Sequence, residues 1–151
     1  MRGYSIVALE NIKNKLNMGG VMRAARVYDA AAVVIAGRRF KDQCSDTTRA
    51  WRHMPVFEVQ DFWQVIPHGC VPVAVEITPQ SRSLVNYTHP ERAIYIFGPE
   101  DGSLSEQVIN RCRDVIKIPT SFCMNLAATV NVVLYDRLSK KREKGTISDV
   151  L

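Results

Sequence analysis

Several signals of membrane, secreted and metal-binding proteins are missing from this chain. No segment approaches the roughly 18 consecutive apolar residues of a membrane span. The first residues form too short an apolar run for a signal peptide and offer no small-residue cleavage site. The four cysteines are spaced neither like a zinc CxxC pair nor like a dense disulfide framework. We therefore expect a cytoplasmic protein with reduced thiols, no metal and no membrane contact.

Fingerprints of common nucleotide-binding folds are also missing. The chain has neither a Walker A motif nor a complete GxGxxG, and no ribose-binding acid follows its second predicted strand. These absences disfavour a flavodoxin-like or nicotinamide-binding module. Internal repeats and low-complexity tracts are absent too. Because 151 residues can bury a real core without disulfides, we expect one domain over residues 1–151, with residues 140–151 as a flexible C-terminal tail.

Positive charge is what the chain has in excess, with a net charge of +5. The first 60 residues hold ten Lys and Arg against five Asp and Glu, whereas residues 61–120 hold five against seven. The basic excess therefore lies toward the two ends of the chain. This pattern suits a polyanionic partner such as nucleic acid, although many enzymes are equally basic for solubility alone.

Short runs rich in Val and Ile alternate with amphipathic segments. The runs are nearly continuous, as expected for parallel strands buried on both faces. The predicted strands are Ile6–Leu9, Ala32–Ala36, Val71–Val75, Ala93–Phe97 and Val115–Ile118, and the predicted helices are Gly20–Tyr28, Glu106–Arg113 and Asn125–Leu138. The alternation predicts an α/β fold with a mostly parallel sheet and helices on both faces. Such sheets bind ligands outside the carboxyl ends of their strands, so a site is expected in the loops that follow the strands.

The loop after the first predicted strand contains paired glycines and leads into a helix. Asn17 can cap that helix, while Gly19 and Gly20 let the backbone approach an anion closely. Arg23 and Arg26 follow on the first helical turns, where they can add phosphate contacts. An ordinary capped helix with two solvated arginines explains the same spacing equally well.

Two later loops also carry polar groups after a strand. Glu100 and Asp101 can bind a cation, a ribose hydroxyl or an arginine, and two solvated loop acids are the plainer interpretation. Ser103 or Ser105 is expected to cap the helix that follows them. In the last loop, Asn125 either caps a helix or orients a ligand. No histidine has a local motif that links it as a base to the neighbouring cysteine of that loop, which favours a cysteine that simply packs over a nucleophile.

In this order, the three loops resemble the three motifs of the SpoU branch of the SPOUT superfamily, the RNA ribose 2′-O-methyltransferases. The matching segments are NMGGVMR at residues 17–23, FGPE at residues 97–100, and IP followed by CMNL at residues 118–119 and 123–126. The resemblance spans nearly the whole chain. It implies a C-terminal trefoil knot that forms a pocket for S-adenosylmethionine, and a homodimer with sites near the subunit interface. Knots are nearly absent from proteins, so only the resemblance predicts one here.

Carried over position by position, the resemblance also assigns site residues. Those with catalytic roles are Arg23, Asn17, Glu100 and Asn125, with Arg23 as the family's catalytic arginine. Those expected to contact the cofactor are Glu76, Gly98, Ile118, Cys123, Met124 and Leu126. Two serines that often flank the third-motif asparagine are replaced here by Cys123 and Ala127, so contacts through the backbone are expected from these two positions.

RNA contacts are expected from the basic residues after the second predicted strand, on the predicted ligand side of the sheet, where aromatic neighbours offer faces for base stacking. These residues are Arg38, Arg39, Lys41, Arg49 and Arg52. The alternative is a solvated basic loop with Trp51 at a dimer interface. The resemblance implies an S-adenosylmethionine-dependent RNA 2′-O-ribose methyltransferase, with tRNA the favoured substrate because the single-domain form is similar to anticodon-loop enzymes. The alternatives are a ribosomal RNA methyltransferase and a catalytically silent RNA-binding homodimer of the same fold.

Overall fold

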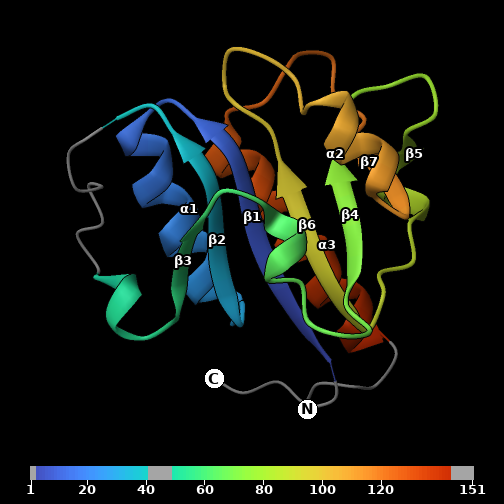
Figure 1. Ribbon diagram of the computed structural model, residues 1–151. Helices are drawn as coiled ribbons and strands as arrows, with labels where there is room; N and C mark the ends of the chain where they lie inside the picture. Colours follow the sequence, from blue (N-terminus) through green and yellow to red (C-terminus); the bar gives the residue numbers. More distant parts are fainter. Residues whose placement is uncertain (1–2, 41–48, 144–151) are drawn as a thin grey trace.

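A parallel sheet forms the centre of the computed structural model, which describes residues 3–40 and 49–143, the last two by their backbone alone (Figure 1). Its seven strands run in the order β3-β2-β1-β6-β4-β7-β5, and every hydrogen-bonded pair is parallel. The strands are β1 (Tyr4–Ile12), β2 (Ala32–Arg38), β3 (Val56–Val59), β4 (Val71–Val75), β5 (Arg82–Ser83), β6 (Arg92–Phe97) and β7 (Asp114–Lys117). The helices are α1 (Lys15–Val27), α2 (Glu106–Arg111) and α3 (Leu126–Glu143), with 3₁₀ turns at η1 (Ala50–Arg52), η2 (Phe62–Gln64) and η3 (Leu84–Asn86).

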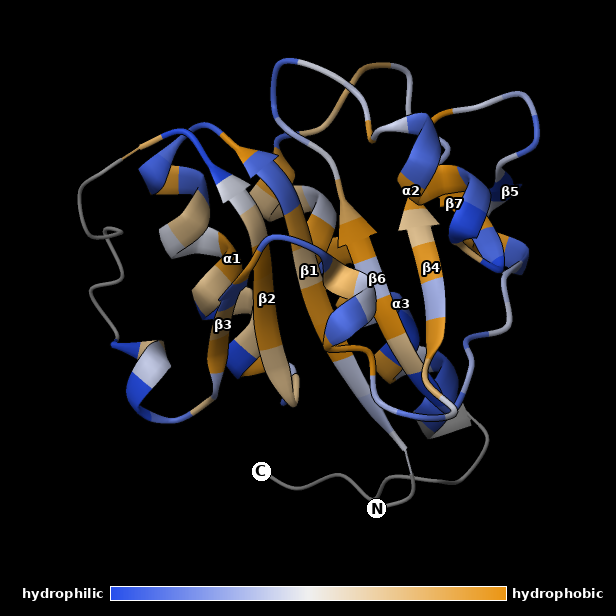
Figure 2. Cartoon of the chain, viewed as in Figure 1, coloured by the Kyte–Doolittle hydropathy of each residue, from blue (hydrophilic) through white to orange (hydrophobic). Residues whose placement is uncertain are grey.

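Alternate residues of the central strands face opposite helical layers. Val7 and Leu9 of β1 join a core cluster that includes α1 and α3, whereas Ile6 and Ala8 join a second cluster with α2 and η2. The central strands are consequently apolar along most of their length, as Figure 2 shows in orange. Because both faces of these strands are buried, their apolar runs are continuous, and this confirms the predicted α/β fold with helices on both faces.

Helix α1 begins earlier than predicted and has a different cap. The side-chain oxygen of Asn14 accepts a hydrogen bond from the backbone N–H of Leu16 at 2.8 Å, so Asn14 is the N-cap and Asn17 lies within the first turn. Gly20 also lies inside α1, where a Cβ atom would come within 2.7 Å of the Cβ of Ala127 on α3. The expected anion cradle is therefore wrong, because this glycine serves the close packing of two helices.

The other helix ends follow the sequence more closely. Ser105 caps α2, accepting from the N–H of Val108 at 3.4 Å. Asn125 caps α3 through its side-chain oxygen, which accepts from the N–H of Ala127 at 2.9 Å. The tail expected from residue 140 does not begin there, because α3 continues to Glu143. Lys140 lies within this helix, and its Nζ donates to the carbonyl of Leu84 at 2.6 Å. Residues 144–151 lie outside the described part of the chain.

A buried polar cluster holds α3 against the sheet. Arg137 is 4% exposed and donates to the carbonyl oxygens of Pro90 and Glu91 and to the hydroxyl of Tyr95. His89 is bonded through Nδ1 to Tyr95 at 2.6 Å and through Nε2 to Asp136 at 2.8 Å. Burial lowers the pKa of His89 to about 4, against the opposing effect of the Asp136 carboxylate. The imidazole is consequently neutral at pH 7.

Candidate active site

A pocket lies at the carboxyl ends of β4, β6 and β7. Figure 1 shows the loops that follow these strands at the top of the molecule. The volume of the pocket is about 180 Å³. All six residues expected to contact a cofactor line it: Glu76, Gly98, Ile118, Cys123, Met124 and Leu126. The lining is completed by Glu100 and by residues for which no cofactor contact was expected, namely Val75, Ile77, Phe97, Pro99, Gly102, Lys117, Thr120 and Thr129. The structure thus joins three strand exits in one cavity.

The wall formed by the loop after β6 is tightly fitted. A Cβ atom at Gly98 would lie 2.8 Å from the backbone nitrogen of Leu104, so a side chain at this position would displace the loop. Glu76 ties the same loop to β4, because its carboxylate accepts from the N–H of Leu104 at 2.8 Å and from that of Ile77 at 2.8 Å. Glycine and carboxylate together fix the shape of this side of the pocket.

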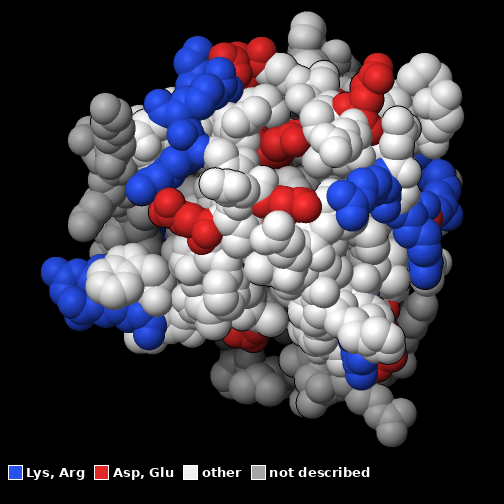
Figure 3. All heavy atoms as spheres, viewed as in Figure 1, with Lys and Arg blue, Asp and Glu red and all other residues white. Residues whose placement is uncertain are grey.

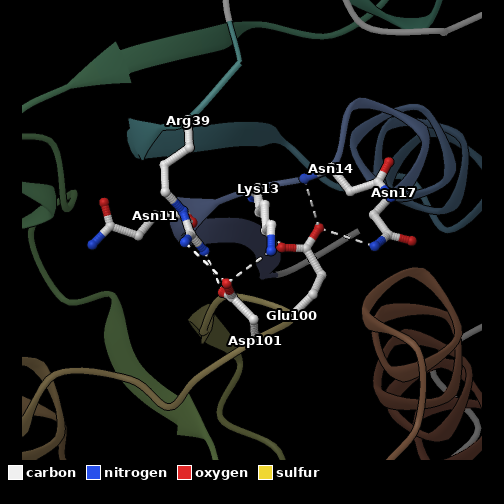
Figure 4. A network of polar contacts seen from close by, with 7 residues as sticks. All are labelled: Asn11, Lys13, Asn14, Asn17, Arg39, Glu100 and Asp101. Atoms are coloured by element: carbon white, nitrogen blue, oxygen red, sulfur yellow. Dashed lines mark hydrogen bonds and ion pairs between the residues drawn. The ribbon is translucent and has the colours of Figure 1, made fainter.

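Three of the four predicted catalytic residues, one from each motif, are joined by hydrogen bonds. Figure 4 shows the contacts around Glu100. The carboxylate of Glu100 accepts from the backbone N–H groups of Lys13 and Asn14, at 2.9 and 3.1 Å, and from the side-chain amide of Asn17 at 2.9 Å. The oxygen of Asn17 in turn accepts from the amide of Asn125 at 2.7 Å. One residue from each motif therefore belongs to a single network.

The same network sets the charge state of Glu100. Partial burial by itself raises the pKa of this carboxyl, but the hydrogen bonds from Asn17 and from the backbone of Lys13 and Asn14 outweigh it and hold the pKa below its usual range. Glu100 is consequently ionised at neutral pH. It can accept hydrogen bonds and fix its neighbours, but it has no proton to donate as a general acid.

Asp101 forms a second set of contacts next to the first. It binds the guanidinium of Arg39 through both carboxylate oxygens and the Nζ of Lys13 at 3.2 Å (Figure 4). Arg39 also donates through Nε to the carbonyl of Asn11 at 3.1 Å. The hydrogen bonds from Arg39 and then from Lys13 hold the pKa of Asp101 far below its usual range. Of the roles considered for this acid, the structure shows the pairing with arginine.

Arg23 lies apart from this network, on the exposed surface of α1. It borders a second hollow, of about 250 Å³, between α1 and α3. The other residues around this hollow are Leu16, Gly20, Ala24, Val27 and Asn131. Within one chain, therefore, Arg23 does not line the pocket that contains the predicted cofactor residues.

The residues expected to bind RNA fall into separate places. Arg38 pairs with Glu58 at 3.4 Å, at the carboxyl end of β2, whereas Lys41 lies outside the described residues. Arg49 and Arg52 precede β3, so they lie at the amino edge of the sheet, opposite the pocket (Figure 1). Their expected position on the ligand side is wrong, because the chain must return to the amino edge before a strand parallel to β2 can begin.

The surface charges reflect this division. In Figure 3, Lys and Arg gather over the carboxyl ends of β1 and β2, over η1, and at the side where α2, β5 and β7 lie, with acidic groups between these patches. Trp51 is 54% exposed beside Arg52, whose guanidinium lies 5.2 Å from the indole centre. The basic excess is thus spread over several sites of the molecule.

Several site residues escaped the sequence patterns. Lys13 and Asn14 contact Glu100 and Asp101 across the fold, and no local spacing indicates such pairs. Phe122 is 86% exposed in the loop that leads to Cys123, a position that its apolar character alone did not predict.

In the described part of the chain, no group of three or more His, Cys, Asp or Glu side chains is placed to hold a metal ion. None of the helices over residues 3–40 and 49–143 is long and apolar enough to cross a membrane.

The fold and the site define an α/β protein with a small-molecule pocket at the carboxyl edge of a parallel sheet. Residues 4–135 match the SpoU rRNA Methylase family. The chain therefore belongs to this family, and membership implies the trefoil knot expected from the motifs.

Individual relatives agree with this assignment. An "uncharacterized tRNA/rRNA methyltransferase" of Archaeoglobus fulgidus is 27% identical over 144 residues, which cover 88% of this chain. The structure of the SpoU methyltransferase AviRb from Streptomyces viridochromogenes, in complex with the cofactor AdoMet, has a TM-score of 0.82 at 16% identity and covers 94% of this chain. A structure described as giving insights into the 2-OH methylation of C/U34 on tRNA has a TM-score of 0.79 at 22% identity, covering 94% of this chain and 93% of its own.

The first two of these proteins are longer. The chain spans 63% of the archaeal relative and 59% of AviRb, whereas it covers 93% of the protein in the third structure.

Proposed function

We propose that the chain is an S-adenosylmethionine-dependent RNA 2′-O-ribose methyltransferase. The observation that carries the proposal is the Glu100–Asn17–Asn125 network, which joins one residue of each motif beside a pocket lined by every residue expected to contact the cofactor. Membership of the SpoU family and the names of the relatives support it. As a member of an RNA-modifying family, the protein is proposed to work in the cytoplasm.

The residues of the pocket fit the cofactor. Ile77, Ile118 and Leu126 offer apolar surface to a flat adenine ring, and Gly98 lets the loop at Leu104 pack closely enough to form the opposite wall. The backbone groups of the loop around Cys123 and Met124 would hold the polar parts. When bound, S-adenosylmethionine supplies a methyl group that is already activated as a sulfonium substituent.

The remaining chemistry is positioning and charge stabilisation. A ribose hydroxyl is a weak nucleophile, and a guanidinium keeps its proton at neutral pH, so Arg23 is not a simple base. Arg23 would instead polarise the 2′-oxygen and stabilise the alkoxide that develops, while the proton leaves to a phosphate oxygen or to water. Glu100, a residue of the second motif, would hold the first-motif segment in place, since its oxygens accept from the backbone of Lys13 and from the side chain of Asn17.

A homodimer would bring these parts together. Arg23 borders a hollow in the α1–α3 surface, and Leu16, Val27 and Tyr135 of that surface are each 60% or more exposed. We propose that two copies pack through this surface, so that Arg23 of one protomer faces the pocket of its partner. Burying these apolar side chains would favour association.

The favoured substrate is tRNA. The structure described for 2-OH methylation of C/U34 on tRNA supports this preference, because its alignment covers 94% of this chain and 93% of its own. Ribosomal RNA is the alternative, because the family description and the archaeal relative both include it.

Methyl transfer to separate RNAs tests the proposal. Purified protein is incubated with methyl-labelled S-adenosylmethionine and either total tRNA or ribosomal RNA, and label in the RNA is counted. We expect label in tRNA, and a loss of about 100-fold or more with Arg23→Ala, the scale seen when a transition-state donor is removed. Full activity of Arg23→Ala would show that Arg23 does not have the proposed role. Label in ribosomal RNA alone would show that ribosomal RNA, and not tRNA, is the substrate.

A further inference from the structure

The carboxylate of Asp101 connects three loops that leave neighbouring strands. Asp101 itself follows β6, Lys13 follows β1, and Arg39 follows β2. Arg39 is further held to the β1 loop, because its Nε donates to the carbonyl of Asn11 at 3.1 Å. These contacts fasten the loop after β6 across the ends of two adjacent strands.

The guanidinium of Arg39 is largely occupied by this arrangement. Its Nη1 donates to Asp101 at 3.1 Å, its Nη2 donates to the other oxygen of the same carboxylate, and its Nε is bound to Asn11. An RNA phosphate would have to displace these partners to be bound through the same edge. The charge of Arg39 is also balanced by the adjacent carboxylate. Both observations favour a role within the protein over a primary contact with RNA.

Asp101 is adjacent in the chain to Glu100, and the two acids share Lys13 as a partner. The backbone N–H of Lys13 donates to Glu100, while its side-chain Nζ donates to Asp101. Two neighbouring residues of one loop are therefore fixed to the same residue of another. Exposed ion pairs contribute little individually, but a bidentate arginine pair within a network holds geometry more firmly.

We propose that Asp101 is a positioning residue for methyl transfer, which binds Arg39 and Lys13 to keep Glu100 seated against the first-motif loop. This inference rests on the proposed function. It gives Arg39 a structural role within the site. It also gives the two acids different roles, because Glu100 bonds directly to Asn17 whereas Asp101 holds Glu100 in place.

The test compares Asp101→Asn with Asp29→Asn. Asp29 is exposed, precedes β2 at the amino edge of the sheet, and has a φ of 52°, which asparagine adopts readily. Both substitutions remove one negative charge from the surface. Amide hydrogen exchange of Lys13 and Asn14, measured by NMR without RNA, reports whether their bonds to Glu100 are weakened. We expect exchange about fivefold faster in Asp101→Asn and unchanged in Asp29→Asn.

Kinetics with the RNA substrate separate positioning from binding. We expect Asp101→Asn to lower kcat about fivefold without raising the KM for RNA, since loss of a negative charge cannot weaken binding to phosphates. Arg39→Lys keeps the charge and loses the fork, so an intermediate kcat is expected. If Asp101→Asn does not fold, amide exchange and kinetics are both measured on Arg39→Lys instead.

Two results would overturn the inference: unchanged exchange at Lys13 and Asn14, or a raised KM for RNA with an unchanged kcat. Failure of the proposed function is recognised separately, as absence of methyl transfer by the unmodified protein. In that case faster amide exchange in Asp101→Asn would still show that Asp101 seats Glu100.

Discussion

The side-chain amides of Asn17 and Asn125 each use both the oxygen and the nitrogen in hydrogen bonds. Asn17 donates to Glu100 and accepts from Asn125, and Asn125 also caps α3 through its oxygen. An amide is suited to this position because it is donor and acceptor at once, whereas a carboxylate only accepts. The sequence motif could identify these residues as polar and important, but the pairing of Glu100 with Lys13, 87 positions away, depends on the fold.

Gly98 offers a test of the pocket at the same scale. Gly98→Ala places a Cβ 2.8 Å from the nitrogen of Leu104, so the loop must shift, and we expect at least a tenfold weaker binding of S-adenosylmethionine by calorimetry. At Gly102 a Cβ would make only an ordinary contact, 3.5 Å from Pro99, so Gly102→Ala is expected to cost less. Equal losses in the two variants would contradict this account of the pocket wall.

At the scale of elements, the strands divide by burial. The five predicted strands were visible because their apolar runs are continuous. The edge strand β3 contains the exposed Glu58, and β5 has only two residues, so neither leaves a pattern of this kind. The start of α1 was missed because Asn14 and Asn17 are both good caps, and only the structure shows which of them the chain uses.

The packing of α1 on α3 gives a second prediction. Gly20→Ala brings two Cβ atoms to 2.7 Å, and we expect the free energy of unfolding to fall by about 1–3 kcal/mol in urea denaturation. Adding Ala127→Gly removes the clash, so the double variant should recover part of this loss, less about 1 kcal/mol for a glycine within a helix. A double variant less stable than Gly20→Ala would show that the clash is not the cause.

At the scale of the whole molecule, two features depend on the complete fold. They are the pocket at one edge of the sheet and the buried polar cluster beneath α3. Some residues that contact one another in these places come from opposite halves of the chain, such as Tyr4 with Arg137 and Asn17 with Asn125. Hydrophobic periodicity predicts layers and helps to place loops, but it carries no information on a knot or on such distant pairs. The motif resemblance predicts the knot, and the structure shows the distant pairs.

The buried cluster makes stability depend on pH. The pKa of His89 is lowered from 6.5 to about 4, so the unfolded chain binds the proton more tightly. The stabilising contribution is therefore complete above pH 6.5 and is lost as the pH falls toward 4, by about 3 kcal/mol in total. In urea denaturation at pH 7 and 4.5, His89→Gln should be less stable at pH 7 and should lose less stability on acidification. An equal loss in both proteins would contradict the assignment.

We propose that this chain methylates the ribose of RNA, and nucleoside mass spectrometry distinguishes this product from a methylated base. RNA incubated with purified protein and S-adenosylmethionine is digested to nucleosides, and the mass added to base and to ribose is read from their fragments. We expect 2′-O-methylated nucleosides that are lost with Arg23→Ala, and sequencing of the modified fragment would identify the RNA. Methylation confined to the bases, with no ribose product, would contradict it.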